Sequence, residues 1–236
     1  MAKKGKLYLI PTPLGEENGD HVLPRYVVEV IRQLDIFIAE KAKTARRYIK
    51  AINHPKAISE LVFSELNKRI DYQEWSQYLK PAEMGNSIGL LSEAGCPGVA
   101  DPGAEIVKLA HEKGIEVIPL VGPSSLLLAL MASGMNGQSF AFHGYLSPKK
   151  ERVGKDLKRL EQIAKREKQT QLFIETPYRN GQLVEQAFKV LGPQTRFCIA
   201  IDLTLPNEYI VTKTIAEWRT TRLPELHKRP AVFLLM

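Results

Sequence analysis

Residues 91–103 read Leu91-Ser-Glu-Ala-Gly-Cys-Pro-Gly-Val-Ala-Asp-Pro-Gly103 and directly follow the apolar run that begins at Ser87. Glycines permit positive φ and a close approach of backbone to a ligand, whereas prolines stiffen the chain. In open α/β sheets, ligands bind where loops leave the carboxyl ends of strands. The segment therefore predicts a ligand-binding loop after a buried strand, and a long connection without a binding role is the alternative.

Two other loops rich in Gly or Pro follow short apolar runs. They are residues 11–15, after the run 6–10, and residues 121–125, after the run 115–120. Neither GxxxxGK[ST] nor GxGxxG occurs, so the usual nucleoside triphosphate and dinucleotide sites lose their main support. The three loops together predict a small-molecule site that is lined largely by backbone.

The apolar pattern along the chain is typical of an α/β protein. We expect two α/β domains, residues 1–120 as a doubly wound domain and residues 121–236 with a mixed sheet. The strands expected are 6–10, 35–39, 87–91, 115–120, 140–142, 170–174, 197–201, 208–213 and 231–235. The longer helices expected are 23–34, 66–79, 104–113, 147–168 and 183–191.

The composition is that of an ordinary globular protein, with 44% hydrophobic and 25% charged residues in 236. No apolar run reaches the roughly 18–20 residues that span a bilayer. Cys96 and Cys198 stand too far apart for a CxxC pair, and the histidines lack the spacing of a zinc site. We expect a cytoplasmic protein with no membrane segment and no metal.

The net charge of +7 arises entirely from residues 121–236, because residues 1–120 hold 16 basic and 16 acidic side chains. Residues 41–50 nevertheless hold five cations and no acid, and helical spacing places Lys43, Arg46, Arg47 and Lys50 on one face. This face predicts a track for phosphates, with a solvated helix face as the alternative. Residues 147–168 mix nine basic with four acidic side chains at pairing distances, which favours a role in solubility.

Three segments, Leu7-Tyr-Leu-Ile-Pro-Thr-Pro-Leu-Gly15, Leu91 to Gly103 and Pro119-Leu-Val-Gly-Pro-Ser-Ser125, resemble the tetrapyrrole methylase superfamily. Within it, the sequence is most similar to the ribosomal RNA small subunit methyltransferase I family. The resemblance implies two α/β lobes with S-adenosylmethionine (SAM) in the cleft between them, unlike a Rossmann-type methyltransferase. It also implies 2′-O-methylation of a ribose in small-subunit ribosomal RNA, and a homodimer.

The resemblance assigns cofactor contacts position by position. They are Leu14, Ala94, Gly95, Cys96, Val99, Ser124, Ser125, Glu175, Thr204 and Ala231. Ribose methylation also needs a group that removes or stabilises the hydroxyl proton. The catalytic candidates are Glu40, Lys43, Asp101 and Glu175. The candidates for substrate binding are Lys43, Arg46, Arg47, Tyr178 and Arg179.

Some of these residues have simpler interpretations. Asp101 precedes Pro102 and is suited to capping the next helix, and Glu175 is suited to pairing with Arg179. The substrate-side motifs also depart from the family: Glu40-Lys-Ala-Lys43 replaces Glu-Asp-Thr-Arg, Tyr178 replaces a histidine, and residues 201–205 lack two cations. A methylase of a small, tetrapyrrole-like molecule therefore stays open, as does a SAM- or RNA-binding protein with weak or no catalysis.

Overall fold

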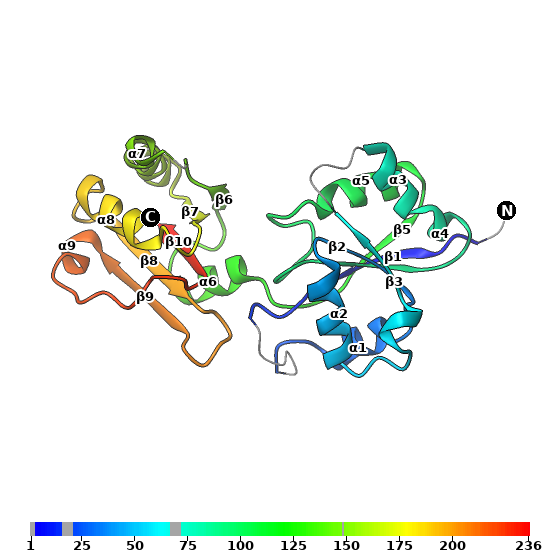
Figure 1. Ribbon diagram of the computed structural model, residues 1–236. Coiled ribbons are helices and arrows are strands. Elements are labelled where there is room, and N and C mark those ends of the chain that lie inside the picture. The colour runs from blue at the N-terminus through cyan, green and yellow to red at the C-terminus, as the bar shows by residue number, and fades with distance from the viewer. Residues whose placement is uncertain (1–2, 16–20, 67–71, 148) are drawn as a thin grey trace. The chain divides into compact units, whose positions relative to one another are not determined.

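The computed structural model describes residues 3–15, 21–66, 72–147 and 149–236, and the chain divides into two compact units. The units are Met1–Ser124 and Ser125–Met236. The division therefore lies in the loop that follows the last strand of the first sheet. Each unit has one five-stranded sheet (Figure 1).

The sheet of the first unit is entirely parallel, with strand order β3-β2-β4-β1-β5. Two of its three interior strands, β2 and β4, are uniformly apolar, as expected for strands that are covered on both faces. Because all five strands run the same way, their carboxyl ends share one edge. The strands are β1 (Lys6–Ile10), β2 (Ile36–Ala39), β3 (Val62–Glu65), β4 (Ile88–Leu91) and β5 (Glu116–Pro119).

Helices cover both faces of this sheet, as the doubly wound prediction requires. On one face, α1 (Arg25–Ile31) and α2 (Ala42–Ala51) bury Val27, Ile31 and Ile49 against Phe37. The other face packs on α3 (Tyr72–Tyr78), α4 (Lys80–Glu83) and α5 (Gly103–Glu112). Gly114, at φ +60°, follows α5 in the left-handed conformation that commonly ends a helix.

One strand of the first unit was missed, and one expected helix is described only in part. Strand β3 was not predicted, because as an edge strand it buries few side chains and lacks a clear apolar run. Its Phe63 is fixed by stacking on Phe37, with 5.4 Å between ring centroids. The helix expected over 66–79 is observed only as α3, and residues 67–71 lie outside the described chain. A short 3₁₀ turn (Ile58–Glu60) precedes β3.

The second unit has the mixed sheet that its closely spaced strands predicted, in the order β6-β7-β10-β8-β9. Strand β10 (Ala231–Leu235) lies antiparallel between β7 (Thr170–Ile174) and β8 (Arg196–Ile201). Strand β6 (Phe140–Tyr145) pairs parallel with β7, and β9 (Tyr209–Thr214) pairs antiparallel with β8.

Stacked phenylalanines from the three central strands form the core of the second unit. The ring centroid of Phe233 lies 6.0 Å from that of Phe173 and 6.0 Å from that of Phe197. This face is covered by α7 (Lys150–Glu167), α8 (Asn180–Val190) and α9 (Ile215–Trp218). Helix α6 (Ser125–Ser133) contacts strands β9 and β10 of this sheet. Thr212 of β9 donates a hydrogen bond to the backbone carbonyl of Ser133 in α6.

Among the described residues, no helix combines the length and the apolar composition that crossing a bilayer requires.

Candidate functional site

The loops after β1 and β4 are joined at the carboxyl edge of the first sheet. Thr12 and Gly95 form a two-way backbone bridge, in which each amide donates to the other's carbonyl at 3.0 Å. The buried hydroxyl of Ser92 donates to the Gly95 carbonyl at 2.6 Å and lies 3.3 Å from the hydroxyl of Thr12. The sequence did not single out Thr12 and Ser92, although Ser92 directly follows β4 and Thr12 lies two residues after the end of β1.

Gly95 lies where this loop meets the loop after β5. Its φ is +76°, and a Cβ at this position would approach the Leu14 side chain to 3.2 Å and the Pro123 carbonyl oxygen to 3.3 Å. The Cys96 thiol donates to the same Pro123 carbonyl at 3.5 Å. Burial, followed by the charge of Asp101, raises the pKa of this thiol, which suits a packed neutral side chain. Three loops distant in sequence therefore contact one another at one edge.

Asp101 holds the signature loop, residues 92–102, in a closed turn. Its Oδ1 accepts hydrogen bonds from the backbone amides of Gly98 at 2.7 Å and Gly103 at 2.8 Å. Burial raises the pKa of this carboxyl group, while the two amide bonds lower it, so the net shift is upward. Pro102 holds the N-cap position of α5, and Asp101, one residue earlier, binds the amide of Gly103, the first residue of the helix.

Helix α2 begins at the same edge, directly after β2. Lys41 and Glu93 form an ion pair of 3.4 Å that links this segment to the signature loop, and Glu65 accepts from the Ala42 amide at 2.6 Å. Glu40 lies beside these residues and is half-buried. The cations of the predicted phosphate track, Lys43, Arg46, Arg47 and Lys50, are all exposed.

In the second unit, Glu175 follows β7 and is held by its neighbours. Its Oε1 accepts from the Thr176 amide at 2.6 Å and from Arg179 Nη2 at 2.5 Å, and its side chain is 3% exposed. The pairing considered from the spacing of Glu175 and Arg179 therefore exists. A carboxylate with these donors is suited to orienting the guanidinium group.

The same edge of the second sheet contains residues that sequence reasoning missed. Arg229 Nε donates to Asp202 Oδ2 at 2.7 Å, and its other nitrogens donate to the backbone carbonyls of Asn207 and Glu225. The His227 ring lies edge-on to the Tyr178 ring, with 5.7 Å between centroids. The imidazole of His227 and the guanidinium group of Arg229 therefore lie beside Tyr178 and Asp202, in the two segments whose motifs lack the histidine and the cations of the family.

The predicted cofactor residues fall into two groups, each within its own unit. Leu14 and the residues from Ala94 to Val99 belong to the loops that Gly95 and Pro123 hold together, and Ser124 follows Pro123 directly. Ser125 opens α6 of the second unit. Glu175, Thr204 and Ala231 lie at the strand ends of the second sheet, where Ala231 pairs with Ile201. Thr204, at φ +70°, donates its amide to Glu208.

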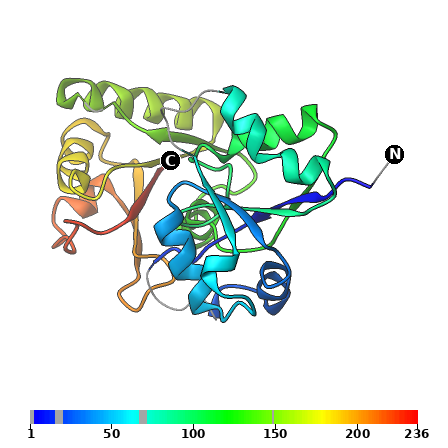
Figure 2. The same ribbon diagram turned by 45° about the vertical axis from the view of Figure 1, so that its right-hand side comes forward.

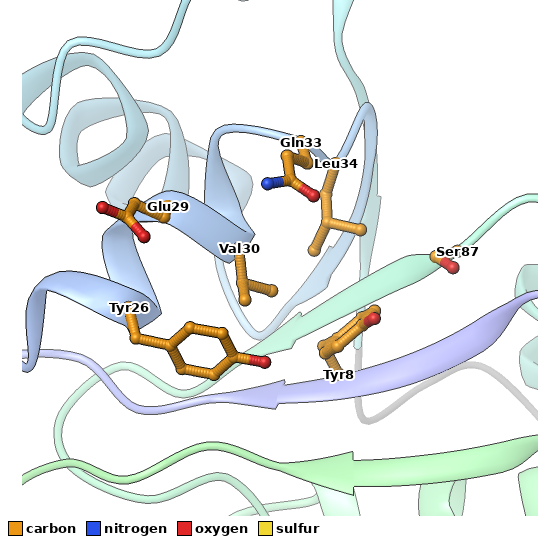
Figure 3. A pocket seen from close by; sticks show the side chains of 7 residues that line it. All are labelled: Tyr8, Tyr26, Glu29, Val30, Gln33, Leu34 and Ser87. Carbon is orange, nitrogen blue, oxygen red and sulfur yellow. The ribbon is translucent and has the colours of Figure 1, made fainter.

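A separate pocket of about 230 Å³ lies between α1 and the sheet of the first unit (Figure 3). Ser87 immediately precedes β4, so the pocket is near the amino ends of the strands and away from the signature loop. Its lining residues are Tyr8, Tyr26, Glu29, Val30, Gln33, Leu34 and Ser87.

The residues at the edge of the first sheet fit SAM in their chemistry. Leu14 and Val99 would offer apolar surface to such a ligand, and Val99 is 48% exposed. Serine hydroxyls and loop carbonyls supply hydrogen-bonding groups without a net charge. Within the described parts of the chain, no group of three or more His, Cys, Asp or Glu side chains is placed to hold a metal ion.

Comparison with known proteins shows to which family of proteins the chain belongs. Residues 6–218 match the model of the family described as Tetrapyrrole (Corrin/Porphyrin) Methylases. The chain belongs to this family of SAM-dependent methyltransferases. The predicted α/β fold class, enzyme class and cofactor are thereby confirmed.

The particular relatives are ribosomal RNA enzymes. The chain is 32% identical over 215 residues to the ribosomal RNA small subunit methyltransferase I of Bacillus subtilis (strain 168), covering 90% of this chain and 68% of that protein. It is also 32% identical over 211 residues to the protein of that name from Vibrio cholerae, covering 89% of this chain and 69% of that one.

Solved structures show the same fold at low identity. The methyltransferase CobJ aligns with a TM-score of 0.64 at 19% identity, over 98% of this chain and 93% of that chain. A uroporphyrin-III C-methyl transferase from Thermus thermophilus, complexed with S-adenyl homocysteine, aligns with a TM-score of 0.57 at 17% identity, over 98% of this chain and 97% of that one.

Proposed function

We propose that this chain transfers a methyl group from SAM to a ribose 2′-hydroxyl of small-subunit ribosomal RNA. The observation that carries the proposal is the 32% identity to enzymes of that name, which extends over about nine-tenths of the chain. The exposed cations of α2 support it, because phosphate contacts dominate the affinity of proteins for nucleic acids.

When bound, SAM supplies an electrophilic methyl group. In our proposal the signature loop, residues 92–102, and Leu14 hold the cofactor, with Ser124, Ser125, Glu175, Thr204 and Ala231 as further predicted contacts. Alignment of the two reactants and exclusion of water provide much of the rate in such a displacement.

The proposed candidates for the proton-handling role are Glu40, Lys43, Asp101 and Glu175. Asp101 and Glu175 each hold structural hydrogen bonds through one oxygen, which fixes the position of their carboxyl groups. Tyr178 and Arg179 are the proposed substrate contacts in the second unit, together with Lys43, Arg46 and Arg47 in the first. Arg179 is suited to contact substrate because Glu175 fixes its orientation.

The test is incubation with radiolabelled SAM and 30S subunits from a strain that lacks this protein, followed by nucleoside analysis. Label in a 2′-O-methylated nucleoside supports the proposal. Label only in a porphyrinoid extract would establish the small-molecule methylase instead. SAM binding without label in either substrate would leave a binding protein with weak or no catalysis.

We also propose a cytoplasmic location, since a ribosomal substrate is found there, and a homodimer. The dimer is supported by α6, which is apolar on all sides and leaves Met131 78% and Leu127 51% exposed. Light scattering coupled to size-exclusion chromatography checks the mass: one chain of 26.6 kDa contradicts the dimer.

A further inference from the structure

The side of α7 that faces away from the core carries an excess of positive charge that is not apparent from the sequence of the helix. Figure 2 shows this long helix side-on. Val153, Leu157, Leu160 and Ala164 are buried in the core of the second unit, which fixes the side of α7 that faces outward.

Two of the four acidic residues of α7, Asp156 and Glu161, accept hydrogen bonds from backbone amides, and of the outer cations only Lys165 forms an ion pair with either of them within the described chain. Asp156 Oδ2 accepts from the Ser147 amide at 3.1 Å. Glu161 Oε1 accepts from the Gly192 amide at 2.8 Å and from the Thr195 hydroxyl, and it pairs with Lys165 at 3.3 Å. Helical spacing predicted the i,i+4 pair of Glu161 with Lys165, but not the hydrogen bonds that Asp156 and Glu161 accept from backbone amides.

The consequence is a continuous cationic face. From residue 152 to residue 166, the exposed side chains of α7 comprise six cations and Gln162, with no carboxylate among them. Lys165 and Arg166 pair with acids of the same helix. Within the described chain, no ion pair or hydrogen bond engages the other four side chains, which we call the α7 cationic face: Arg152, Lys155, Lys158 and Arg159.

Solubility alone does not account for this arrangement. Like charges three or four positions apart repel each other on a helix, and three such pairs occur among these four residues. A surface selected for solubility intersperses both signs. The neighbouring α8 presents one exposed acid, Glu185, and one exposed cation, Lys189, so it does not compensate the excess.

We infer that the α7 cationic face binds the phosphate backbone of the RNA substrate, as a contact surface in the second unit additional to α2. The inference rests on the proposed RNA substrate. The four side chains span about 10 Å along the helix axis, enough for several successive phosphates of one strand. Lysine and arginine heads at this spacing contact phosphate without reading sequence.

The test compares the full-length protein with a variant carrying Arg152→Gln, Lys155→Gln, Lys158→Gln and Arg159→Gln. The probe is in vitro transcribed small-subunit ribosomal RNA, titrated at several salt concentrations. We expect at least tenfold weaker binding at 0.1 M salt and a salt slope shallower by about two to three, because up to four phosphate contacts are lost. SAM affinity and thermal unfolding should stay unchanged.

A matched control removes the same number of exposed charges elsewhere, through Arg25→Gln, Lys80→Gln, Lys189→Gln and Arg222→Gln. An equal change in this control, or an unchanged slope in the α7 variant, would overturn the inference. An unchanged RNA slope with lost binding to polyglutamate would assign the face to an acidic protein instead. If the wild-type protein binds no RNA, both the proposed function and this inference fail. If the wild-type protein binds RNA and the α7 variant binds it equally well, only this inference fails.

Discussion

Different kinds of contact hold the loops at the carboxyl edge of the first sheet and the segments at the end of the second sheet where β7 and β8 end and β10 begins. In the first unit, the loops are held by backbone bonds between Thr12 and Gly95 and by the close approach of Gly95 to Pro123. In the second unit, the corresponding segments are held by side-chain ion pairs, Glu175 with Arg179 and Asp202 with Arg229.

The difference decides what a change of residue does. A backbone-built edge depends on glycine at particular positions. In the first unit this edge also carries the Lys41–Glu93 ion pair and the Asp101 carboxyl group, which bonds to amides close to its own position in the sequence. Where ion pairs hold the segments together, a charged residue can be replaced if another part of the chain provides a partner of opposite charge. The same contrast explains why the first edge retains a recognisable signature and the second does not.

The largest expected effect is that of Gly95→Val. A β-branched side chain at φ +76° is strained, and its Cβ would press on Leu14 and Pro123. We expect SAM affinity to fall at least a hundredfold in calorimetry, with a loss of about 1–3 kcal/mol in unfolding free energy.

Gly137→Val is the matched control, since nothing lies within 4 Å of a Cβ there and its φ is not positive. This control should bind SAM as the wild-type protein does. Unchanged affinity in Gly95→Val would remove the signature loop from the cofactor site.

The second edge is tested by Arg229→Met. The substitution removes three donors and leaves the Asp202 carboxylate, whose side chain is 12% exposed, without its cation. We expect a loss of about 2–3 kcal/mol in urea unfolding, since hydrogen bonds to charged groups are the stronger ones. The exposed Arg222→Met should change stability by less than about 0.5 kcal/mol. Equal stability of the two variants would show that the ion pair does not hold this edge.

The comparison extends to substrate binding through the triple variant Lys43→Ala, Arg46→Ala and Arg47→Ala. Losing three phosphate contacts should weaken RNA binding about tenfold at 0.1 M salt and reduce the salt slope by about two. The variant Arg25→Ala, Lys56→Ala and Lys80→Ala removes three exposed cations elsewhere in the same unit and serves as the control. A slope that stays unchanged in the first variant would make the α2 face a merely solvated one.

The smallest expected effect on stability is that of Glu161, a side chain of α7. Its carboxylate accepts a hydrogen bond from the backbone amide of Gly192. Burial raises the pKa of Glu161, but the bonds from Thr195, Gly192 and Lys165 outweigh it and lower the pKa below the ordinary 4.5. The stabilisation is therefore complete above that value and is lost as pH falls through the lower folded pKa.

We expect Glu161→Gln to cost about 1 kcal/mol at pH 7 and progressively less in acid. Glu151→Gln, on the same helix, is exposed and has no ion pair or hydrogen bond within the described chain, so it should show no such dependence. A pH-independent loss in Glu161→Gln would show that its charge is not what stabilises the α7–Gly192 contact.

The sequence predicted those features that depend on neighbouring residues. The signature loop, the two α/β units and strands 170–174 and 231–235 follow from local patterns of glycine, proline and apolar residues. Arg229 was missed as a partner of Asp202 because 27 positions separate them and a surface arginine has no distinctive neighbours. The hydrogen bonds of Asp156 and Glu161 were missed for a related reason. Their donors are the backbone amides of Ser147 and Gly192, and every residue except proline carries such an amide.

The closed turn around Asp101 has a thermodynamic consequence. Because one carboxylate oxygen already binds the amides of Gly98 and Gly103, the conformational entropy of the loop is lost when the protein folds and not when the cofactor arrives. Cofactor association should therefore show a heat-capacity change that reflects only the apolar area the ligand itself buries, without the larger change that accompanies the ordering of a segment.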